Sequence, residues 1–288
     1  MKQISIIIPN VNSLLIHNIL QALENQTIDT SVYEVLIIGI DEPGLVKENK
    51  TVRFIETPPG TYASNNRNRG MEEAQGDIFL FIDHDCIPAP DLLERHWRRH
   101  QQGEAVVGGA IKFGTQNYYQ LADNVSAFHD LLDFMPEGPV PYLATSNLSV
   151  DRSVVTKAGK MPAQRNRAED LEWTVQFREI GYRLYFDPQA VVFHDPPRKD
   201  IKTVWQHWVV DAHDTLKVRL KYAHLLDTPT LAKYRWIYLL GSPGVAAWAT
   251  VRTFAHPRAF SQYWHTLPLV YLTKLAWCWG AFKNFPNV

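Results

Sequence analysis

The chain has 288 residues, 45% of them hydrophobic, which is enough for one large globular domain with an appended segment. Its 29 basic and 30 acidic residues argue against general nucleic-acid binding, because that requires a basic excess. Two cysteines provide no disulfide framework and indicate a reducing compartment. The first apolar run, residues 4–8, lacks a small-residue cleavage site after it, so we expect a strand and not a signal peptide.

The first eighty residues alternate short apolar runs with segments of helical spacing. We expect helices at 13–26 and 65–75, and strands at 4–9, 35–38, 52–55 and 78–82. Because the apolar runs do not alternate with polar residues, both faces of each strand should be buried, as in a parallel α/β sheet. Ligands of such sheets bind beyond the carboxyl ends of the strands. Polar clusters follow three of these strands, at residues 9–12, 39–42 and 83–85.

The remaining elements are less regular. We expect strands at 105–113, 143–150, 183–186 and 190–193, a helix at 169–180 and a long helix at 201–223. This order suggests a catalytic domain over residues 1–200 and a helical C-terminal segment over 201–288. Within the catalytic domain, residues 1–110 would form the nucleotide-binding half and 111–200 the acceptor half.

Two aspartates follow the fourth predicted strand. Asp83 and Asp85 are two residues apart, so both carboxylates can approach one divalent cation. Such cations are commonly bound by one or two carboxylates together with substrate phosphates. The same spacing also occurs in solvated turns, but the apolar strand before it and the prolines after it favour a binding site.

Three further groups are candidates for the same site. Arg67 and Asn68, on a predicted helix, could bind phosphate or ribose, or could form an exposed basic helix face. Glu169 and Asp170 could supply a general base, or only a charge pair favoured by the helix dipole. His194 could complete a metal site, although a lone histidine after a strand is more often structural.

The order of these motifs resembles that of the family 2 glycosyltransferases of the GT-A fold, over about residues 3–210. The matching stretches read Pro-x-x-Asn, Arg-Asn-x-Gly, Gly-Asp-Ile-Phe-Leu-Phe-Ile-Asp-x-Asp, Glu-Asp and Gly-Tyr-Arg-x-x-x-x-Pro-x-Ala-x-Val-x-His. The resemblance implies an α/β fold with a Rossmann-like mixed sheet flanked by helices. It also implies an inverting transfer from a nucleotide-diphosphate sugar to a hydroxyl acceptor, with Mn²⁺ or Mg²⁺ as cofactor.

The resemblance assigns a role to each matching residue. The nucleotide-sugar would contact Pro9, Asn12, Asp41, Arg67, Asn68 and Asp83. The metal ligands would be Asp83, Asp85 and His194. Asp170 would be the catalytic base, with Glu169 beside it. The acceptor side would include Ser146, Asn147, Arg167 and Trp173.

This sequence also departs from the family pattern. After the second predicted strand it has Gly-Ile-Asp-Glu where the family often has two adjacent acidic residues, which leaves base recognition open. The Gln-x-x-Arg-Trp motif of processive synthases is absent, which predicts a single-transfer enzyme. Two other classes remain open. One is a nucleotidyltransferase, which would normally carry a glycine-rich phosphate loop after the first strand, and the other is a non-catalytic nucleotide- or glycan-binding member.

The C-terminal part has a different composition. Residues 231–288 contain six basic residues, no acidic residue and five of the nine tryptophans. The apolar stretches 236–251 and 264–282 fall short of the roughly 20 uninterrupted residues of a spanning helix. Such composition is typical of helices in the membrane interface. We therefore expect a peripheral enzyme on the cytoplasmic side of a membrane, with a glycan or lipid-linked acceptor and a role in envelope or extracellular glycan synthesis. A packed helical subdomain, an oligomer contact and a true span are the alternatives.

Overall fold

The chain divides into two units in the computed structural model, which describes residues 3–114, 117–164 and 167–287. The first unit comprises Met1–Lys112 and Met135–His194, and the second comprises Phe113–Phe134 and Asp195–Val288. The break expected near residue 200 lies close to this division. Residues 113–134, which we expected in the acceptor half of the catalytic domain, group instead with the C-terminal helices.

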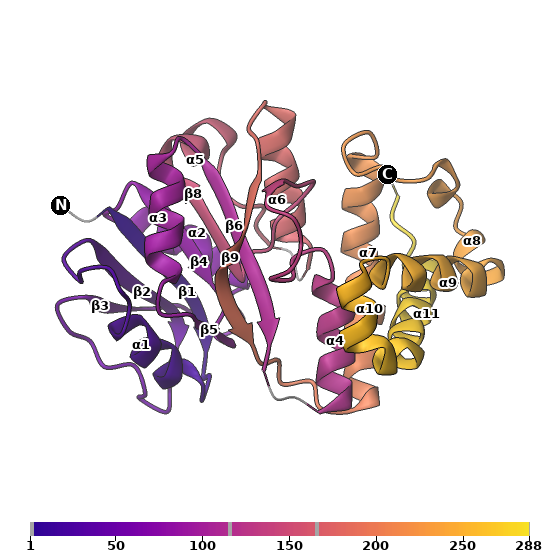
Figure 1. The fold of residues 1–288 in the computed structure, drawn as a ribbon, viewed down its shortest axis with the longest axis horizontal. Helices are drawn as coiled ribbons and strands as arrows, with labels where there is room; N and C mark the ends of the chain where they lie inside the picture. Colours follow the sequence, from indigo (N-terminus) through magenta and orange to yellow (C-terminus); the bar gives the residue numbers. More distant parts are fainter. Residues whose placement is uncertain (1–2, 115–116, 165–166, 288) are drawn as a thin grey trace. The chain divides into compact units, whose positions relative to one another are not determined.

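A mixed sheet forms the centre of the first unit (Figure 1). Among the described residues the strand order is β3-β2-β1-β4-β8-β6-β9-β5, with β7 paired to β9. The strands are β1 Ile4–Val11, β2 Tyr33–Ile40, β3 Val52–Glu56, β4 Ile78–Ile82, β5 Cys86–Pro88, β6 Val106–Phe113, β7 Gly138–Pro139, β8 Asn147–Asp151 and β9 Tyr185–His194. β1 runs parallel to β2 and β4, whereas β8 runs antiparallel to β4.

The four parallel strands consist mainly of β-branched and aromatic residues. Each coincides with an expected strand and extends it by no more than two residues at either end. β1 and β4 are buried along nearly their whole length, as their continuous apolar sequence predicts. Their shared direction places the carboxyl ends of β1, β2 and β4 at one edge of the sheet.

Helices flank this sheet on both sides. They are α1 Ile16–Glu24, α2 Ala63–Glu73, α3 Leu92–Gln101, α5 Arg152–Ala158 and α6 Glu169–Glu179. α1 packs against β5 and α3 against β9, and α3 lies in front of the sheet in Figure 1. α2 packs on β1 and β2, and at Gly70 it comes so close that a Cβ would lie 2.5 Å from Cγ2 of Ile7.

Three expectations for this unit are corrected. α1 begins at Ile16, three residues later than expected. α2 ends at Glu73, so Gly76 is not its stop signal. Gly76 instead permits close packing on β1, because a Cβ there would lie 2.8 Å from the carbonyl carbon of Ile4. The two short strands expected over 183–193 are one continuous strand, β9, because the Asp-Pro pair between them continues the extended chain.

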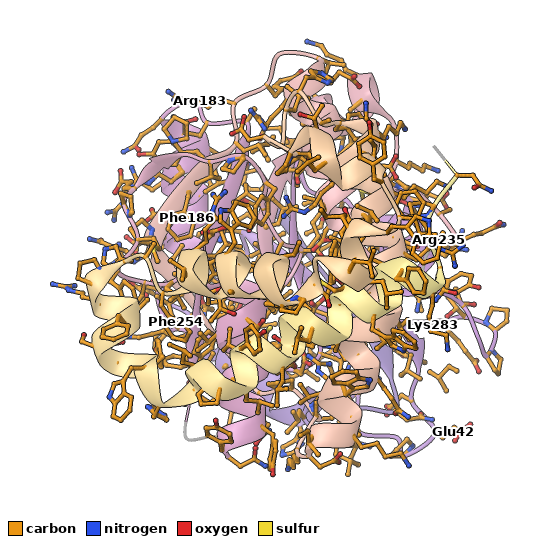
Figure 2. All side chains as sticks on the ribbon, turned by 90° about the vertical axis from the view of Figure 1, so that its right-hand side faces the viewer. Glu42, Arg183, Phe186, Arg235, Phe254 and Lys283 are labelled. Atoms are coloured by element: carbon orange, nitrogen blue, oxygen red, sulfur yellow. The ribbon has the colours of Figure 1, made fainter. Side chains whose placement is uncertain are left out.

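The second unit is helical. Its elements are α4 Tyr118–Phe128, α7 Ile201–Lys221, η1 Thr230–Lys233, α8 Ile237–Leu240, α9 Ser242–Thr253, α10 Pro257–Tyr263, η2 Trp264–Thr266 and α11 Leu267–Lys283. α11 packs along both α7 and α9 (Figure 2). A Cβ at Gly280 would lie 2.2 Å from the carbonyl oxygen of Val209, so glycine permits the close approach of α11 to α7. None of the helices in the described ranges combines the length and apolarity needed to span a bilayer.

A buried aspartate joins the two chain segments of the second unit. The carboxylate of Asp123, on α4, has no exposed surface. It lies 2.5 Å from Nε of Arg198, 3.1 Å from Nδ1 of His207 and 2.8 Å from Nε1 of Trp208. Burial alone would raise the pKa of Asp123, but the bond from His207 and the charge of Arg198 hold it at about 2. Asp123 is therefore an ionised structural group with a full set of partners.

Candidate active site

The loops that follow β1, β2 and β4 are connected to one another. Ser13 Oγ donates a hydrogen bond of 3.3 Å to the carbonyl oxygen of His84, which ties the loop after β1 to the loop after β4. Asn12 Nδ2 donates to the carboxylate of Glu42, and its Oδ1 accepts the Glu42 N–H at 2.9 Å. The polar clusters predicted from the sequence therefore surround one place at the edge of the sheet.

The end of β2 is packed closely against the end of β1. Gly39 has a φ of 142°, and a Cβ there would lie 1.8 Å from the carbonyl oxygen of Asn10, so only glycine fits. Asp41, two residues later, accepts two backbone N–H groups of its own loop at 3.1 and 2.7 Å. Asp41 thus stabilises the loop, and its contact with a nucleotide stays a prediction. Pro9 is buried within β1, directly before Asn10.

The pairing of β5 with β9 brings Asp85 and His194 together. The two strands are antiparallel, with Cys86 opposite His194. Nε2 of His194 lies 3.5 Å from Oδ2 of Asp85. Two ligand atoms that are each about 2.1 Å from a cation lie at most about 4.2 Å apart, so this pair fits a single divalent ion. A carboxylate oxygen and an imidazole nitrogen are suitable donors for Mn²⁺ and related ions.

Cys86 completes a three-residue group that the sequence did not suggest. Potential ligand atoms of Asp85, Cys86 and His194 all lie within 4.8 Å of one another. Burial raises the pKa of the Cys86 thiol well above its usual value, and a protonated thiol is a poor ligand for a hard cation. The donors that suit such a cation are therefore the carboxylate of Asp85 and the imidazole of His194.

Arg67 is the centre of a buried ion-pair network. It lies on α2 and is only 4% exposed. Its Nη2 lies 2.5 Å from Oδ1 of Asp83, and its Nη1 lies 3.0 Å from Oε1 of Glu169. Burial alone would lower the pKa of Arg67, but the two carboxylates outweigh burial and raise it. The alternative of an exposed basic helix face is therefore wrong for Arg67, whereas a metal contact by Asp83 stays a prediction.

Asp170 follows Glu169 at the start of α6. Its Oδ1 accepts the N–H of Leu171 at 2.7 Å, and its Oδ2 accepts the N–H of Thr145 at 3.3 Å. Burial and then the charge of Glu169 raise the pKa of Asp170 to about 7, while the charge of Arg67 opposes this rise. A carboxylate that titrates near neutral pH is matched to general-base catalysis at that pH.

A family model and several known proteins match this chain. The family model is that of glycosyl transferase family 2, and it matches residues 5–159, more than half of the chain. The chain belongs to this family. The glycosyltransferase AglE of Haloferax volcanii is 29% identical over 203 residues, which cover 66% of each protein. The probable glycosyltransferase YdaM of Bacillus subtilis is 23% identical over 231 residues, 72% of this chain and 53% of the relative. The chain thus spans about half to two thirds of these relatives.

Solved structures share the fold of this family 2 glycosyltransferase. The mannosyltransferase PcManGT from Pyrobaculum calidifontis, in complex with GDP-Man and Mn²⁺, has a TM-score of 0.59 at 15% identity. That match covers 98% of this chain and 86% of the other. S. aureus TarS 1–349 has a TM-score of 0.55 at 14% identity, with 98% and 91% covered. The expected GT-A type α/β fold is therefore confirmed, and the family model confirms the glycosyltransferase family, which sets the nucleotidyltransferase alternative aside.

The predicted acceptor-side residues of the glycosyltransferase lie in contrasting surroundings. Asn147 is buried, and its amide nitrogen donates to two backbone carbonyls, at 3.0 and 2.8 Å, while its Oδ1 faces Nε2 of His96 at 2.8 Å. Trp173 is fully buried and packs edge-on against Phe81. Ser146 is buried, and its hydroxyl has no hydrogen-bond partner among the residues that the structure describes. Arg167 is half-buried two residues before α6. Their contact with an acceptor stays a prediction.

Asn68 joins α2 to the segment before α6. Its Nδ2 donates to the carbonyl oxygen of Met161 at 2.9 Å, and its Oδ1 accepts the Met161 N–H at 3.0 Å. A side-chain amide that closes two bonds with one backbone residue works as a clamp. Asn68 therefore holds this segment in place, and a contact with the donor stays a prediction.

Two groups that sequence reasoning missed help to build the site. Glu42 bonds Asn12 in both directions, and Ser13 bridges to the acidic loop through His84. Both residues lie in or beside the polar clusters that follow the strands, which was the available signal. Nothing in the sequence indicates that they would bond residues from another loop.

Proposed function

We propose that this glycosyltransferase moves a sugar from a nucleoside-diphosphate sugar to a hydroxyl acceptor, with inversion at the anomeric carbon. The proposal rests on one arrangement: a candidate cation pair, Asp85 and His194, is linked through Asp83, Arg67 and Glu169 to the candidate base. Donor and acceptor chemistry would thus take place at one edge of the sheet.

The donor would bind beside the loops after β1, β2 and β4. Two structural neighbours support this class of donor, since PcManGT is in complex with GDP-Man and TarS 1–349 with UDP-GlcNAc. Asp85 and His194 would hold Mn²⁺ or Mg²⁺, and such a cation, when bound, neutralises charge on a diphosphate leaving group. Asn12 and Asp41 line the loops that a nucleotide would contact.

The base would be Asp170. Its carboxylate would take the proton of the acceptor hydroxyl while the acceptor oxygen forms its bond to the anomeric carbon. The bond from that carbon to the diphosphate oxygen breaks in the same displacement, and its electron pair leaves with the nucleoside diphosphate. Attack on the face opposite the leaving group inverts the configuration. Glu169 would not compete as the base, because its carboxylate pairs with Arg67.

A panel of nucleoside-diphosphate sugars tests this proposal. The enzyme is incubated with each donor and with candidate acceptors, and nucleoside diphosphate release is measured with Mn²⁺, with Mg²⁺ and with a chelator. We expect release from at least one donor, its loss on chelation and its recovery when metal is restored. Turnover that persists under chelation, in an enzyme verified to be metal-free, would overturn the cation site.

Two matched variants locate the cation. His194→Ala should abolish metal-dependent release, whereas His84→Ala, which replaces the neighbouring histidine of the acidic loop, should retain most of it. Nuclear magnetic resonance of the product then reports the anomeric configuration. A product that retains the donor configuration would contradict the single displacement.

The cellular role and the location are also proposals. A glycan or lipid-linked acceptor in envelope or extracellular glycan synthesis, reached from the cytoplasmic side of a membrane, would suit the basic and tryptophan-rich composition of residues 231–288. Transfer assays with lipid-linked and water-soluble acceptors of the same sugar sequence would test it. Equal rates with both acceptors would count against a membrane-bound substrate.

A further inference from the structure

Large apolar side chains are exposed on the second unit in an unusual number. Twenty large hydrophobic residues are exposed among those described, and eleven of them lie beyond residue 230. Four of the five C-terminal tryptophans are among them, with exposed fractions from 41% to 62%. Scattered exposed apolar residues are ordinary, but a concentration in one segment marks an interaction surface.

The exposed side of α9 is apolar. Ala246, Thr250 and Thr253 are buried, whereas Gly244, Ala247, Trp248 and Val251 are exposed at helical spacing. Trp248 is 53% exposed and Val251 71% exposed. A helix of a water-facing surface would carry polar residues at these positions, as α3 does with Arg98 and Gln101.

The exposed side of α11 is apolar as well. Gly280 faces α7, which fixes the orientation of the helix. Leu272 and Trp279 are exposed on α11, and Trp279 continues into an aromatic cluster with Phe282 and Trp236. α9 and α11 cross the side of the unit that faces the viewer in Figure 2, where Arg235 and Lys283 lie near each other.

A recess extends this apolar surface toward α7. The atoms that it exposes are apolar. Ile201, Trp205 and Leu272 are among its lining residues, and all three side chains are exposed. The exposed apolar surface is therefore continuous from α11 to the start of α7.

Cations lie directly against the exposed rings. The guanidinium of Arg252 lies 5.1 Å from the ring centre of Trp248, and that of Arg235 lies 4.7 Å from Phe282. The ammonium of Lys283 lies 5.6 Å from Trp279. Residues 231–288 include no acidic side chain to neutralise this charge. Tryptophan with basic residues suits the depth of anionic lipid headgroups.

We propose that the exposed faces of α9 and α11, with the adjoining Trp236 cluster, bind the surface of an anionic lipid bilayer. We call this surface the aromatic face; it comprises Trp236, Trp248, Val251, Leu272, Trp279 and Phe282. The proposal deepens the proposed membrane location and does not depend on the proposed chemistry. Helices of 12 and 17 residues are about 18 and 26 Å long, shorter than the roughly 30 Å hydrocarbon core, so they lie along the surface.

Charge decides between a bilayer and a second copy of the chain as the occupant. A symmetric dimer would place the aromatic face against itself, and so would bring together two sets of cations from a segment that contains no acidic residue. An anionic bilayer supplies the missing negative charge and a layer into which the indole rings can insert. The aromatic face is therefore assigned to lipid.

Flotation of the full-length enzyme with vesicles tests the assignment. We expect binding to phosphatidylcholine vesicles that contain phosphatidylglycerol, much weaker binding to phosphatidylcholine alone, and a loss of binding as salt is raised from about 0.1 M to about 1 M. The double variant Trp248→Ser/Trp279→Ser should bind about tenfold more weakly. Arg252→Gln should weaken binding about fivefold. The matched controls Ile180→Ser and Arg98→Gln, at exposed positions of the first unit, should bind like the parent.

A second measurement needs no variant. Tryptophan fluorescence of the unaltered enzyme should be quenched by vesicles of brominated lipid, because the exposed indoles insert and Trp173 does not. A parent enzyme that neither floats with anionic vesicles nor shows quenching would overturn the proposal. So would a dimer in vesicle-free solution that the double variant dissociates. Donor hydrolysis, measured without vesicles in the same samples, reports on the catalytic proposal separately.

Discussion

Two aspartates, one in each unit, have opposite surroundings. Asp123 in the helical unit is held by Arg198, His207 and Trp208, and its pKa is about 2. Asp170 in the sheet unit accepts two backbone N–H groups, lies beside the like charge of Glu169, and its pKa is raised to about 7. The same side chain is a fixed anion in one place and a group ready to exchange protons in the other.

The difference comes from which carboxylates the nearest arginine is bonded to. Arg198 bonds Asp123 directly, so the charge of the carboxylate is compensated. Arg67, the cation nearest the candidate base, is bonded to Asp83 and Glu169 and not to Asp170. A carboxylate that is bonded directly to its nearest cation thus stays ionised and has a structural role. A carboxylate whose nearest cation is bonded to other carboxylates can exchange a proton near neutral pH.

The sharpest test of this contrast is the activity of Asp170→Asn. Removal of a general base should slow transfer about 10²- to 10⁴-fold, with donor binding unchanged. Single-turnover transfer and a donor-binding titration measure the two quantities. Asp123→Asn is the matched control, and its folded fraction should retain parental transfer and donor binding. Normal transfer by Asp170→Asn would remove the residue from the mechanism.

Replacing Arg67 should have the largest effect on stability. Arg67→Met leaves Asp83, Glu169 and Asp170 close together without their shared counter-charge, and breaking such a buried network costs about 3–5 kcal/mol. Urea denaturation measures the free energy of unfolding. Arg69→Met, two positions along the same helix in exposed pairs with Glu72 and Glu73, should cost less than about 1 kcal/mol. Equal losses in the two variants would contradict the central role of Arg67.

Asp123→Asn should destabilise the protein in a pH-dependent way. Because the folded pKa of Asp123 lies below its ordinary value of 3.8, its contribution is present above about pH 4 and is lost as pH falls toward 2. The variant should therefore lose about 2 kcal/mol at pH 7 and less at pH 3. Denaturant curves at the two pH values test this, and a pH-independent loss would point to packing alone.

Asp170→Asn should change the stability of the protein in the opposite direction. Its folded pKa is raised above the ordinary value of 3.8, so its contribution to stability is present below about pH 4 and is lost as pH rises through about 7. The variant should be more stable than the parent by roughly 1–3 kcal/mol at pH 8, and the difference should shrink at pH 5. Asp91→Asn, in an exposed pair with Arg95, should show no such trend. A variant less stable than the parent at pH 8 would refute the raised pKa.

The sheet could be predicted because its signal is local. Apolar runs such as Ile78–Ile82 can only be buried strands in this context, and the structure confirms them. α3 was missed because few of its residues are apolar, and α4 was missed because its buried side includes polar residues such as Gln120, Asp123 and Asn124. α4 does have a capping box between Asn117 and Gln120, which is a readable start signal. A whole helix can therefore be missed in the sequence when its apolar residues do not follow a clear helical spacing.

The candidate site could be predicted only in part. Residue order predicted Asp85 and His194, because their types suit a cation and each follows a strand. The burial of Arg67, the clamp formed by Asn68 and the network around Asn147 could not be read from the sequence, because each depends on which distant backbone lies opposite. The type of a side chain indicates what it can bind. Its hydrogen-bond and ion-pair partners within the protein decide whether it can still bind a substrate.

The register of β5 and β9 has a consequence for the chain as a whole. The ladder that sets Cys86 opposite His194 joins positions more than a hundred residues apart, and the chain enters the second unit directly after His194. A cation held by Asp85 and His194 would therefore be a cross-link as well as a cofactor. It would hold His194, the last residue of the sheet unit, against the loop after β4. Occupancy of the site should then raise the melting temperature, with the largest gain in hydrogen-exchange protection along β5 and the end of β9.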